Sequence, residues 1–109
     1  MDQFNVTEDI IDQYINQQDK PFIVDFSAIW SKPCLMYKGY ILEAMKELYD
    51  KAFWGTVDID ISPRLTERFS IITIPTTLFF YQGQIVRQLI GMQDVAVFRK
   101  VLSELVPAT

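Results

Sequence analysis

Residues 73–86 have the sequence TIPTTLFFYQGQIV, in which a proline and a two-residue turn signal bound an apolar run. Proline has no N–H to donate to a sheet ladder, so Pro75 belongs at the start of a strand rather than within one. The segment therefore predicts a strand over residues 76–81, a hairpin turn at Gln82-Gly83 and a returning strand over residues 84–90.

Outside this hairpin, the spacing of apolar residues and the capping signals predict six further elements. Helices are expected from Thr7 to a stop at residues 19–21 and over residues 33–51, 62–69 and 94–105, and strands over residues 22–26 and 53–61. This alternation predicts an α/β fold with parallel strands at the start and an antiparallel pair at the end. At 109 residues, the chain is expected to form a single domain spanning residues 1–109.

The composition excludes several classes of function. Ten Lys and Arg against fourteen Asp and Glu give a net charge of −4 with no block of like charges, which argues against a nucleic-acid partner. One cysteine and no histidine exclude an internal disulfide, a Cys/His zinc site and histidine-assisted nucleophilic catalysis. Because no signal peptide or membrane span is visible in the sequence, we expect a cytoplasmic protein without a membrane partner.

Cys34 is the only thiol, and it follows the loop Trp30-Ser31-Lys32-Pro33 where a helix is expected to begin. The free N–H groups at a helix start stabilise a thiolate, which would make Cys34 reactive. Free cysteine is also among the most buried residue types, and an inert buried thiol is the interpretation that the residue alone favours.

Two further acidic features have alternative interpretations. Asp25 stands between Val24 and Phe26, so its carboxyl group is either desolvated and able to exchange a proton, or placed on a wetter face of the strand or beside a hydroxyl. Periodicity does not choose between these two. Asp58 and Asp60 would share one face of a strand, but no third ligand is visible, so a solvated strand end is favoured and no metal site is expected.

Four features at compatible spacings resemble the thioredoxin family. They are VDFSAIWSKPC (residues 24–34), VDIDISP (57–63), TIPTTLFFYQGQIV (73–86) and the Gly91 that follows. The resemblance extends from about Thr7 to Leu105. It implies the thioredoxin fold, a central mixed β-sheet flanked by helices on both faces, with a cis peptide bond before Pro75.

The resemblance also implies a site. Members of the family exchange thiols and disulfides with a W-C-G-P-C loop, whose first cysteine attacks a substrate disulfide and whose second resolves the mixed disulfide. It places Ser31 and Cys34 at these two positions, and Asp25 at the position of a buried proton relay. It implies a docking groove for an extended partner segment, made by Trp30, Lys32, Pro33, Thr73, Ile74, Pro75, Gly91 and Met92. No cofactor is implied.

The chain departs from the family pattern at the loop itself. Ser31 stands in place of the attacking cysteine, and a serine hydroxyl cannot form a disulfide, so the dithiol cycle is excluded for this chain. Lys32 replaces the loop glycine, and Gly39 replaces the proline that kinks the following helix. Thr56 stands where a lysine often pairs with the buried aspartate.

Three functions are compatible with this pattern. The first is a thioredoxin-like protein with a degenerate S-x-x-C loop that binds extended polypeptide or thiol partners with at most single-thiol chemistry. The second is a disulfide reductase in the form of an attacking-cysteine-to-serine variant, whose dithiol form would also have a thioredoxin reductase as partner. The third is a non-catalytic structural subunit. Whether the chain is an enzyme depends on which of these holds.

Overall fold

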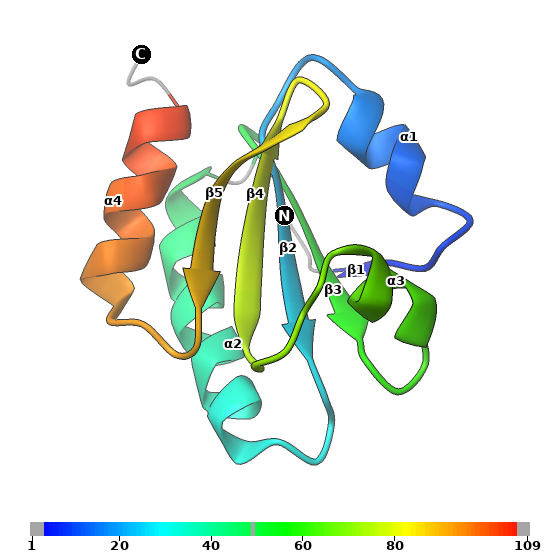
Figure 1. The fold of residues 1–109 in the computed structure, drawn as a ribbon. Helices are drawn as coiled ribbons and strands as arrows, with labels where there is room; N and C mark the ends of the chain where they lie inside the picture. Colours follow the sequence, from blue (N-terminus) through cyan, green and yellow to red (C-terminus); the bar gives the residue numbers. More distant parts are fainter. Residues whose placement is uncertain (1–3, 49, 107–109) are drawn as a thin grey trace.

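In the computed structural model of the chain, which describes residues 4–48 and 50–106, the apolar run FIVDFS forms the central strand β2 (Phe22–Ser27). All six of its residues are buried, as expected for a strand covered on both faces. Strand β3 (Phe53–Asp58) pairs with it in parallel and β4 (Thr76–Tyr81) antiparallel. With β1 (Phe4–Asn5) and β5 (Gln84–Ile90) at the edges, the sheet has the order β1-β3-β2-β4-β5 (Figure 1).

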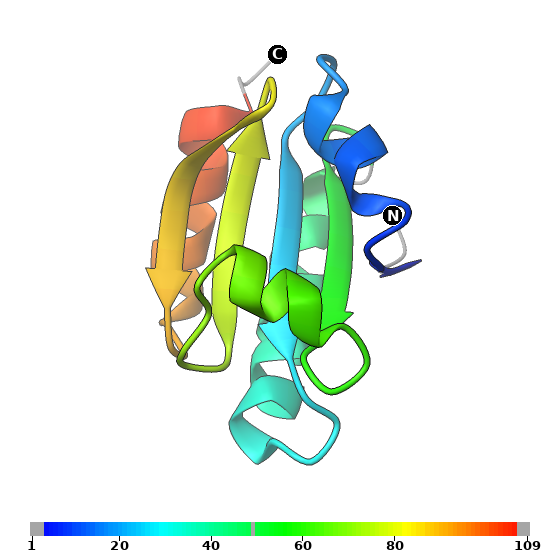
Figure 2. The same cartoon turned by 45° about the vertical axis from the view of Figure 1, so that its right-hand side comes forward.

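Two helices cover each face of this sheet. Helix α2 (Lys32–Met45) continues as a 3-10 turn over Lys46–Leu48 and lies with α4 (Val95–Leu105) on one face. Helices α1 (Ile11–Asn16) and α3 (Pro63–Arg68) lie on the other (Figure 2). The strand residues alternate between two separate apolar cores accordingly. The predicted α/β architecture, with a mixed sheet and helices on both faces, is therefore confirmed.

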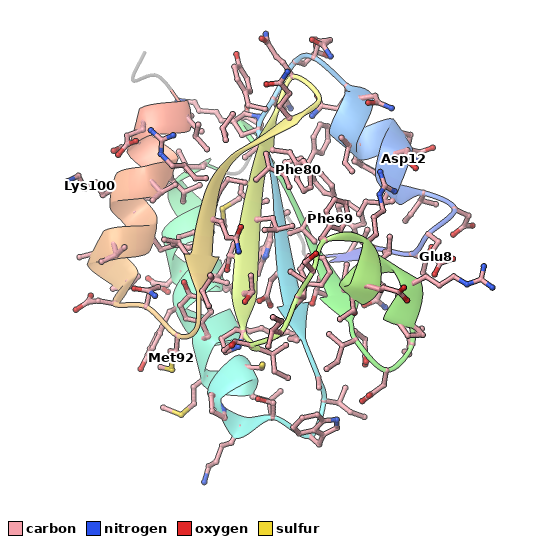
Figure 3. The ribbon with its side chains drawn as sticks, viewed as in Figure 1. Glu8, Asp12, Phe69, Phe80, Met92 and Lys100 are labelled. Carbon is pink, nitrogen blue, oxygen red and sulfur yellow. The ribbon has the colours of Figure 1, made fainter. Side chains whose placement is uncertain are left out.

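The short helices are held to each other and to the sheet by side chains. Asp12 of α1 accepts a hydrogen bond from the Arg68 guanidinium of α3, with 2.8 Å between Oδ1 and Nη2. Beside α3, the rings of Phe69 and Phe80 meet edge to face at 5.7 Å (Figure 3). These contacts attach the α3 layer to β4, which carries Pro75 at its start.

Local signals located the hairpin and the last helix correctly. Gln82 and Gly83 both have positive φ, 51° and 86°, as a two-residue hairpin turn requires. Asp94 caps α4, and its carboxylate accepts the N–H of Ala96 at 3.0 Å. None of the helices within the described residues is long and apolar enough to cross a membrane.

Three predicted boundaries were wrong, and one short strand was missed. The first helix begins at Ile11 rather than Thr7, because the Thr7 carbonyl closes a separate turn by accepting the N–H groups of residues 10 and 11. Helix α2 ends at Met45 and its 3-10 turn at Leu48, short of the predicted residue 51; Tyr49 lies outside the described residues. The strand predicted over 53–61 ends at Asp58, and the two-residue strand β1 was not predicted.

Gly55 is required by the close approach of β1 to β3. A Cβ at this position would lie 2.2 Å from Cγ2 of Val6, whose side chain is buried. We expect Gly55→Ala to lower the free energy of unfolding by about 1–3 kcal/mol, measured by urea denaturation, because the added methyl group would overpack the core next to β1.

Gly39→Ala is the matched control for this substitution. A Cβ at Gly39 meets nothing within 4 Å, and the position lies inside α2. There the same change should raise stability by roughly 0.5–1 kcal/mol through helix propensity. Equal effects of the two substitutions would contradict the steric role of Gly55.

Candidate functional site

One end of the sheet gathers the residues that the sequence singled out. Strands β2, β3 and β5 end there and β4 begins there (Figure 1). Phe26 lies opposite Thr76, which lies opposite Ile90 on its other side. Ser27 lies opposite Asp58. The loops that follow or precede these residues are therefore neighbours, although they are far apart in the sequence.

The loop before α2 is built on Ser31. Its backbone is extended, with φ −90° and ψ 110°, and its hydroxyl accepts the N–H of Cys34 at 3.3 Å. The Ser31 carbonyl accepts the N–H of Leu35 at 3.1 Å, and Pro33 occupies the first turn, where its missing N–H costs nothing. Serine is a favoured residue for this position, so Ser31 has a structural function as the cap of α2.

Cys34 lies on the buried face of α2. It is a free thiol with no exposed surface, and Tyr37 and Ile41 continue the same buried face. The structure thus agrees with the interpretation of a shielded thiol. With no exposed surface, the thiol is out of reach of a partner sulfur in this conformation.

Trp30 is held at the surface by an acid from the next loop. Its side chain is 67% exposed, and its indole N–H donates to Oδ2 of Asp60 at 2.8 Å. The backbone N–H of Asp60 in turn donates to Oδ1 of Asp58 at 2.8 Å. Sequence reasoning placed the two acids on one strand face and missed this contact, because β3 ends at Asp58 and Asp60 lies in the turn beyond it.

The acids of this turn do not form a metal centre. Within residues 4–48 and 50–106, no group of three or more His, Cys, Asp or Glu side chains is arranged to hold a metal ion. The acids at positions 58 and 60 instead orient the exposed indole of Trp30.

Asp25 is fully buried, which excludes a position on a wetter face of the strand. Burial raises the pKa of its carboxyl group from 3.8 to about 7, and the positive charge of Lys38 opposes the shift. Thr56, which stands in place of the family's lysine, donates its hydroxyl to the Asp25 backbone carbonyl at 3.2 Å and not to the carboxylate. Asp25 can therefore gain or lose a proton near neutral pH.

Pro75 immediately precedes β4 and follows a cis Ile74–Pro75 bond, as the resemblance implied. Its carbonyl accepts the N–H of Gly91 at 2.8 Å. Gly91 has a φ of 79°, in the left-handed region that favours glycine. The neighbouring Thr73 carbonyl accepts the Thr76 hydroxyl at 2.6 Å. The hydrogen bond between Pro75 and Gly91 therefore joins the segment before β4 to the turn after β5.

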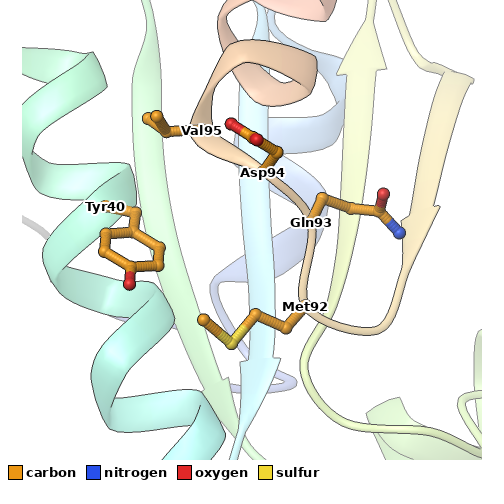
Figure 4. Close-up of a pocket in the computed structure, with 5 residues that line it drawn as sticks. All are labelled: Tyr40, Met92, Gln93, Asp94 and Val95. Atoms are coloured by element: carbon orange, nitrogen blue, oxygen red, sulfur yellow. The ribbon is translucent and has the colours of Figure 1, made fainter.

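Two hollows lie beside this end of the sheet. The larger, about 630 Å³, lies between α2 and the start of α4 (Figure 4), and its lining residues are Tyr40, Met92, Gln93, Asp94 and Val95. The smaller, about 200 Å³, is lined by residues that include Ile72, Thr73, Gln88 and Ile90. Of the predicted groove residues, Met92 lines the larger hollow and Thr73 the smaller.

The other predicted groove residues line neither hollow. Trp30 is exposed on the loop, and Lys32 and Pro33 are exposed at the start of α2. Ile74 and Gly91 are partly buried, and Pro75 is buried. Sequence reasoning missed Tyr40, Ile72 and Ile90, whose side chains are exposed. Exposure of an apolar side chain depends on which elements cover it, and no pattern in the sequence signalled this.

Four features together define a thioredoxin-fold protein. They are a cysteine at a helix start, a buried carboxyl group in the central strand, a cis proline just before β4 and the strand order of the sheet. The chain belongs to the thioredoxin family, since the family model described as Thioredoxin matches residues 2–104.

Individual relatives agree with this assignment. The thioredoxin of Alicyclobacillus acidocaldarius is 40% identical over 77 residues, covering 71% of this chain and 73% of that protein. The bifunctional thioredoxin reductase/thioredoxin of Mycobacterium leprae is 33% identical over 89 residues; the match covers 82% of this chain and 19% of that protein. A mutant thioredoxin from Halobacterium salinarum has the same fold, with a TM-score of 0.85 at 20% identity, over 98% of this chain and 92% of that one.

Proposed function

We propose that this member of the thioredoxin family binds extended polypeptide or thiol partners at the Trp30–Pro75 end of its sheet, with at most single-thiol chemistry. The observation that carries the proposal concerns the two reactive positions of the loop: Ser31 caps α2 with its hydroxyl, and the only thiol, Cys34, is fully buried. Ser31, Cys34 and Asp25 are the groups that would take part in chemistry. Residues 1–109 act as one thioredoxin-like domain.

Apolar side chains exposed around the loop support the binding part of this proposal. Ile72 is 95% exposed and Trp30 67%. Clusters of this kind on a monomer mark interaction sites, because an apolar partner removes them from water. The exposed apolar residues of this end are Ile29, Trp30, Leu35, Met36, Ile61, Ile72, Ile90 and Met92.

The chemistry available to Cys34 stops after one step. Its thiol loses a proton, for which ionised Asp25 is an acceptor, and the sulfur attacks a partner disulfide. A mixed disulfide forms while the second partner sulfur leaves as a thiolate. Ser31 cannot resolve the product, so release needs an external thiol. This step needs Cys34 in its reduced form, and cytoplasmic thiols are kept reduced, so the proposal includes a cytoplasmic location.

A disulfide reductase in the form of an attacking-cysteine-to-serine variant is the second candidate. Its support is that the cis Pro75, the exposed Trp30 and the buried Asp25 remain in place around the substituted position. A thioredoxin reductase would be a partner of its dithiol form.

Binding can be tested with matched isoleucine substitutions. Ile72 lies at the site, whereas Ile85 is 46% exposed next to the hairpin turn at the other end of β5. We expect Ile72→Ala to weaken binding of carboxymethylated insulin B chain at least about threefold, because burial of an isoleucine contributes of order 1 kcal/mol or more. Ile85→Ala should leave the affinity unchanged, with both measured by titration calorimetry. Equal effects, or no binding by the unaltered protein, would contradict the proposed binding site.

A further inference from the structure

Four buried polar side chains occupy the layer between α2 and the sheet. Among the described residues, the buried side-chain atoms without a hydrogen-bond partner are both carboxyl oxygens of Asp25, the hydroxyls of Tyr37 and Thr77, and the indole N–H of Trp54. Tyr37 and Trp54 belong to the core cluster on the α2 face. Buried polar groups are normally hydrogen-bonded, so a concentration of unpaired ones needs an explanation.

The sheet register brings Thr77 to Asp25. Ile23 lies opposite Phe79 in the antiparallel pair, and both belong to the core cluster on the α2 face. Asp25 and Thr77 lie opposite each other two residues further on, so their side chains point to the same face. Directly opposed Cβ atoms are about 4.5–5.5 Å apart, which places the Thr77 hydroxyl beside the carboxyl group.

Tyr37 approaches the same place from α2. Burial raises the pKa of the Tyr37 hydroxyl. The interaction with the Thr77 hydroxyl lowers this pKa in part, and the negative charge of Asp25 raises it further. Tyr37 therefore lies within the electrostatic reach of both. It is also one helical turn after Cys34 on the same buried face of α2.

The chemical types of these groups are complementary. An ionised carboxylate only accepts hydrogen bonds, whereas tyrosine and threonine hydroxyls can donate. The other groups that face Asp25 are the ammonium of Lys38 on α2 and Thr56 on β3, whose hydroxyl is engaged with the Asp25 backbone carbonyl. Three unpartnered donors lie in this layer, the hydroxyls of Tyr37 and Thr77 and the indole N–H of Trp54. Thr77 lies opposite Asp25 and Tyr37 is coupled to both, whereas Trp54 lies opposite Ile23, two residues before Asp25.

We propose that Tyr37 is a positioning residue. When Asp25 is ionised, the hydroxyls of Tyr37 and Thr77 both donate hydrogen bonds to its carboxylate. They thereby hold this negative charge next to the buried face of α2 that carries Cys34. The expected effect on the titration of Asp25 follows from the cluster alone. The expected effect on the reactivity of Cys34 rests on the proposed function, in which Asp25 accepts the thiol proton.

The test compares Tyr37→Phe with Tyr40→Phe, a matched control one turn along the same helix whose side chain is 40% exposed. The Asp25 titration is followed by NMR of carboxyl-¹³C aspartate, with Asp25→Asn to assign the signal. Tyr37→Phe should raise the Asp25 midpoint by about one unit, a tenfold higher proton affinity, because the charged form loses a donor. Tyr40→Phe should leave the midpoint unchanged.

Thr77→Val is the second variant, and it tests the hydroxyl donors of Asp25 if Tyr37→Phe fails to fold. It should shift the midpoint in the same upward direction. An Asp25 midpoint that is unchanged or lowered in the folded variants overturns the proposal.

The pH dependence of Cys34 alkylation by iodoacetamide separates this inference from the proposed function. Its inflection should move upward with the Asp25 midpoint in Tyr37→Phe. If the Asp25 signal moves and the alkylation profile does not, the role of Tyr37 stands and the use of Asp25 by Cys34 is refuted. If the Asp25 signal does not move, the role of Tyr37 is refuted whatever the alkylation profile shows.

Discussion

Ser31→Cys is expected to raise insulin-disulfide reduction, in a dithiothreitol-coupled assay, from background to at least about 100-fold above it. The unaltered chain should not exceed background. The new thiol at position 31 would lie at the start of α2, where free N–H groups and the adjacent Lys32 favour the thiolate. That thiolate attacks the insulin disulfide, and Cys34 then attacks the mixed disulfide. The products are reduced insulin and an internal disulfide, which dithiothreitol reduces.

The controls for this experiment separate capture from turnover. Ser31→Cys combined with Cys34→Ser should form mixed disulfides and turn over far more slowly than Ser31→Cys, since only the external dithiothreitol can resolve them. Ser31→Ala should be as inactive as the unaltered chain and less stable by about 1 kcal/mol, because the cap of α2 is lost. Catalytic turnover by the unaltered chain would refute the single-thiol proposal. An inactive but folded Ser31→Cys variant would argue against the reductase alternative.

Asp25→Asn is expected to raise the free energy of unfolding at pH 8 by at most about 4 kcal/mol, in urea denaturation. The raised pKa, about 7 in the folded chain against 3.8, means that ionised Asp25 opposes folding. Its unfavourable effect is absent below pH 3.8, grows as the pH rises from there to about 7, and stays constant above. The unaltered protein should therefore lose stability over this window, and the contribution of position 25 should vanish in Asp25→Asn.

Asp12→Asn is a control of opposite sign. The Arg68 guanidinium lowers the pKa of Asp12, so this carboxylate stabilises the fold above its ordinary pKa and loses that effect as the pH falls. Both side chains are largely exposed, and the expected loss of stability at pH 8 is small. A stability that rises between pH 4 and 7 in the unaltered protein, but not in Asp25→Asn, would contradict the account of Asp25.

The sequence was sufficient for elements whose signals are local. The Gln82-Gly83 turn, the Asp94 cap and the proline at the start of β4 each depend on the conformation of a few adjacent residues, and all three occur where they were predicted. Strand β1 could not be predicted in this way. It has two residues and exists only because Phe4 lies beside Gly55 in the folded chain.

The same distinction between local signals and tertiary contacts applies to the functional site. The sequence by itself determined that the loop carries one sulfur and one hydroxyl, which excludes a dithiol cycle because covalent chemistry depends on residue identity. Only the tertiary structure decided that Asp25 is desolvated, that Asp60 holds the indole of Trp30, and that Ile72 is exposed. Burial and contacts between loops depend on which elements cover a residue, and periodicity within one strand or helix does not contain that information.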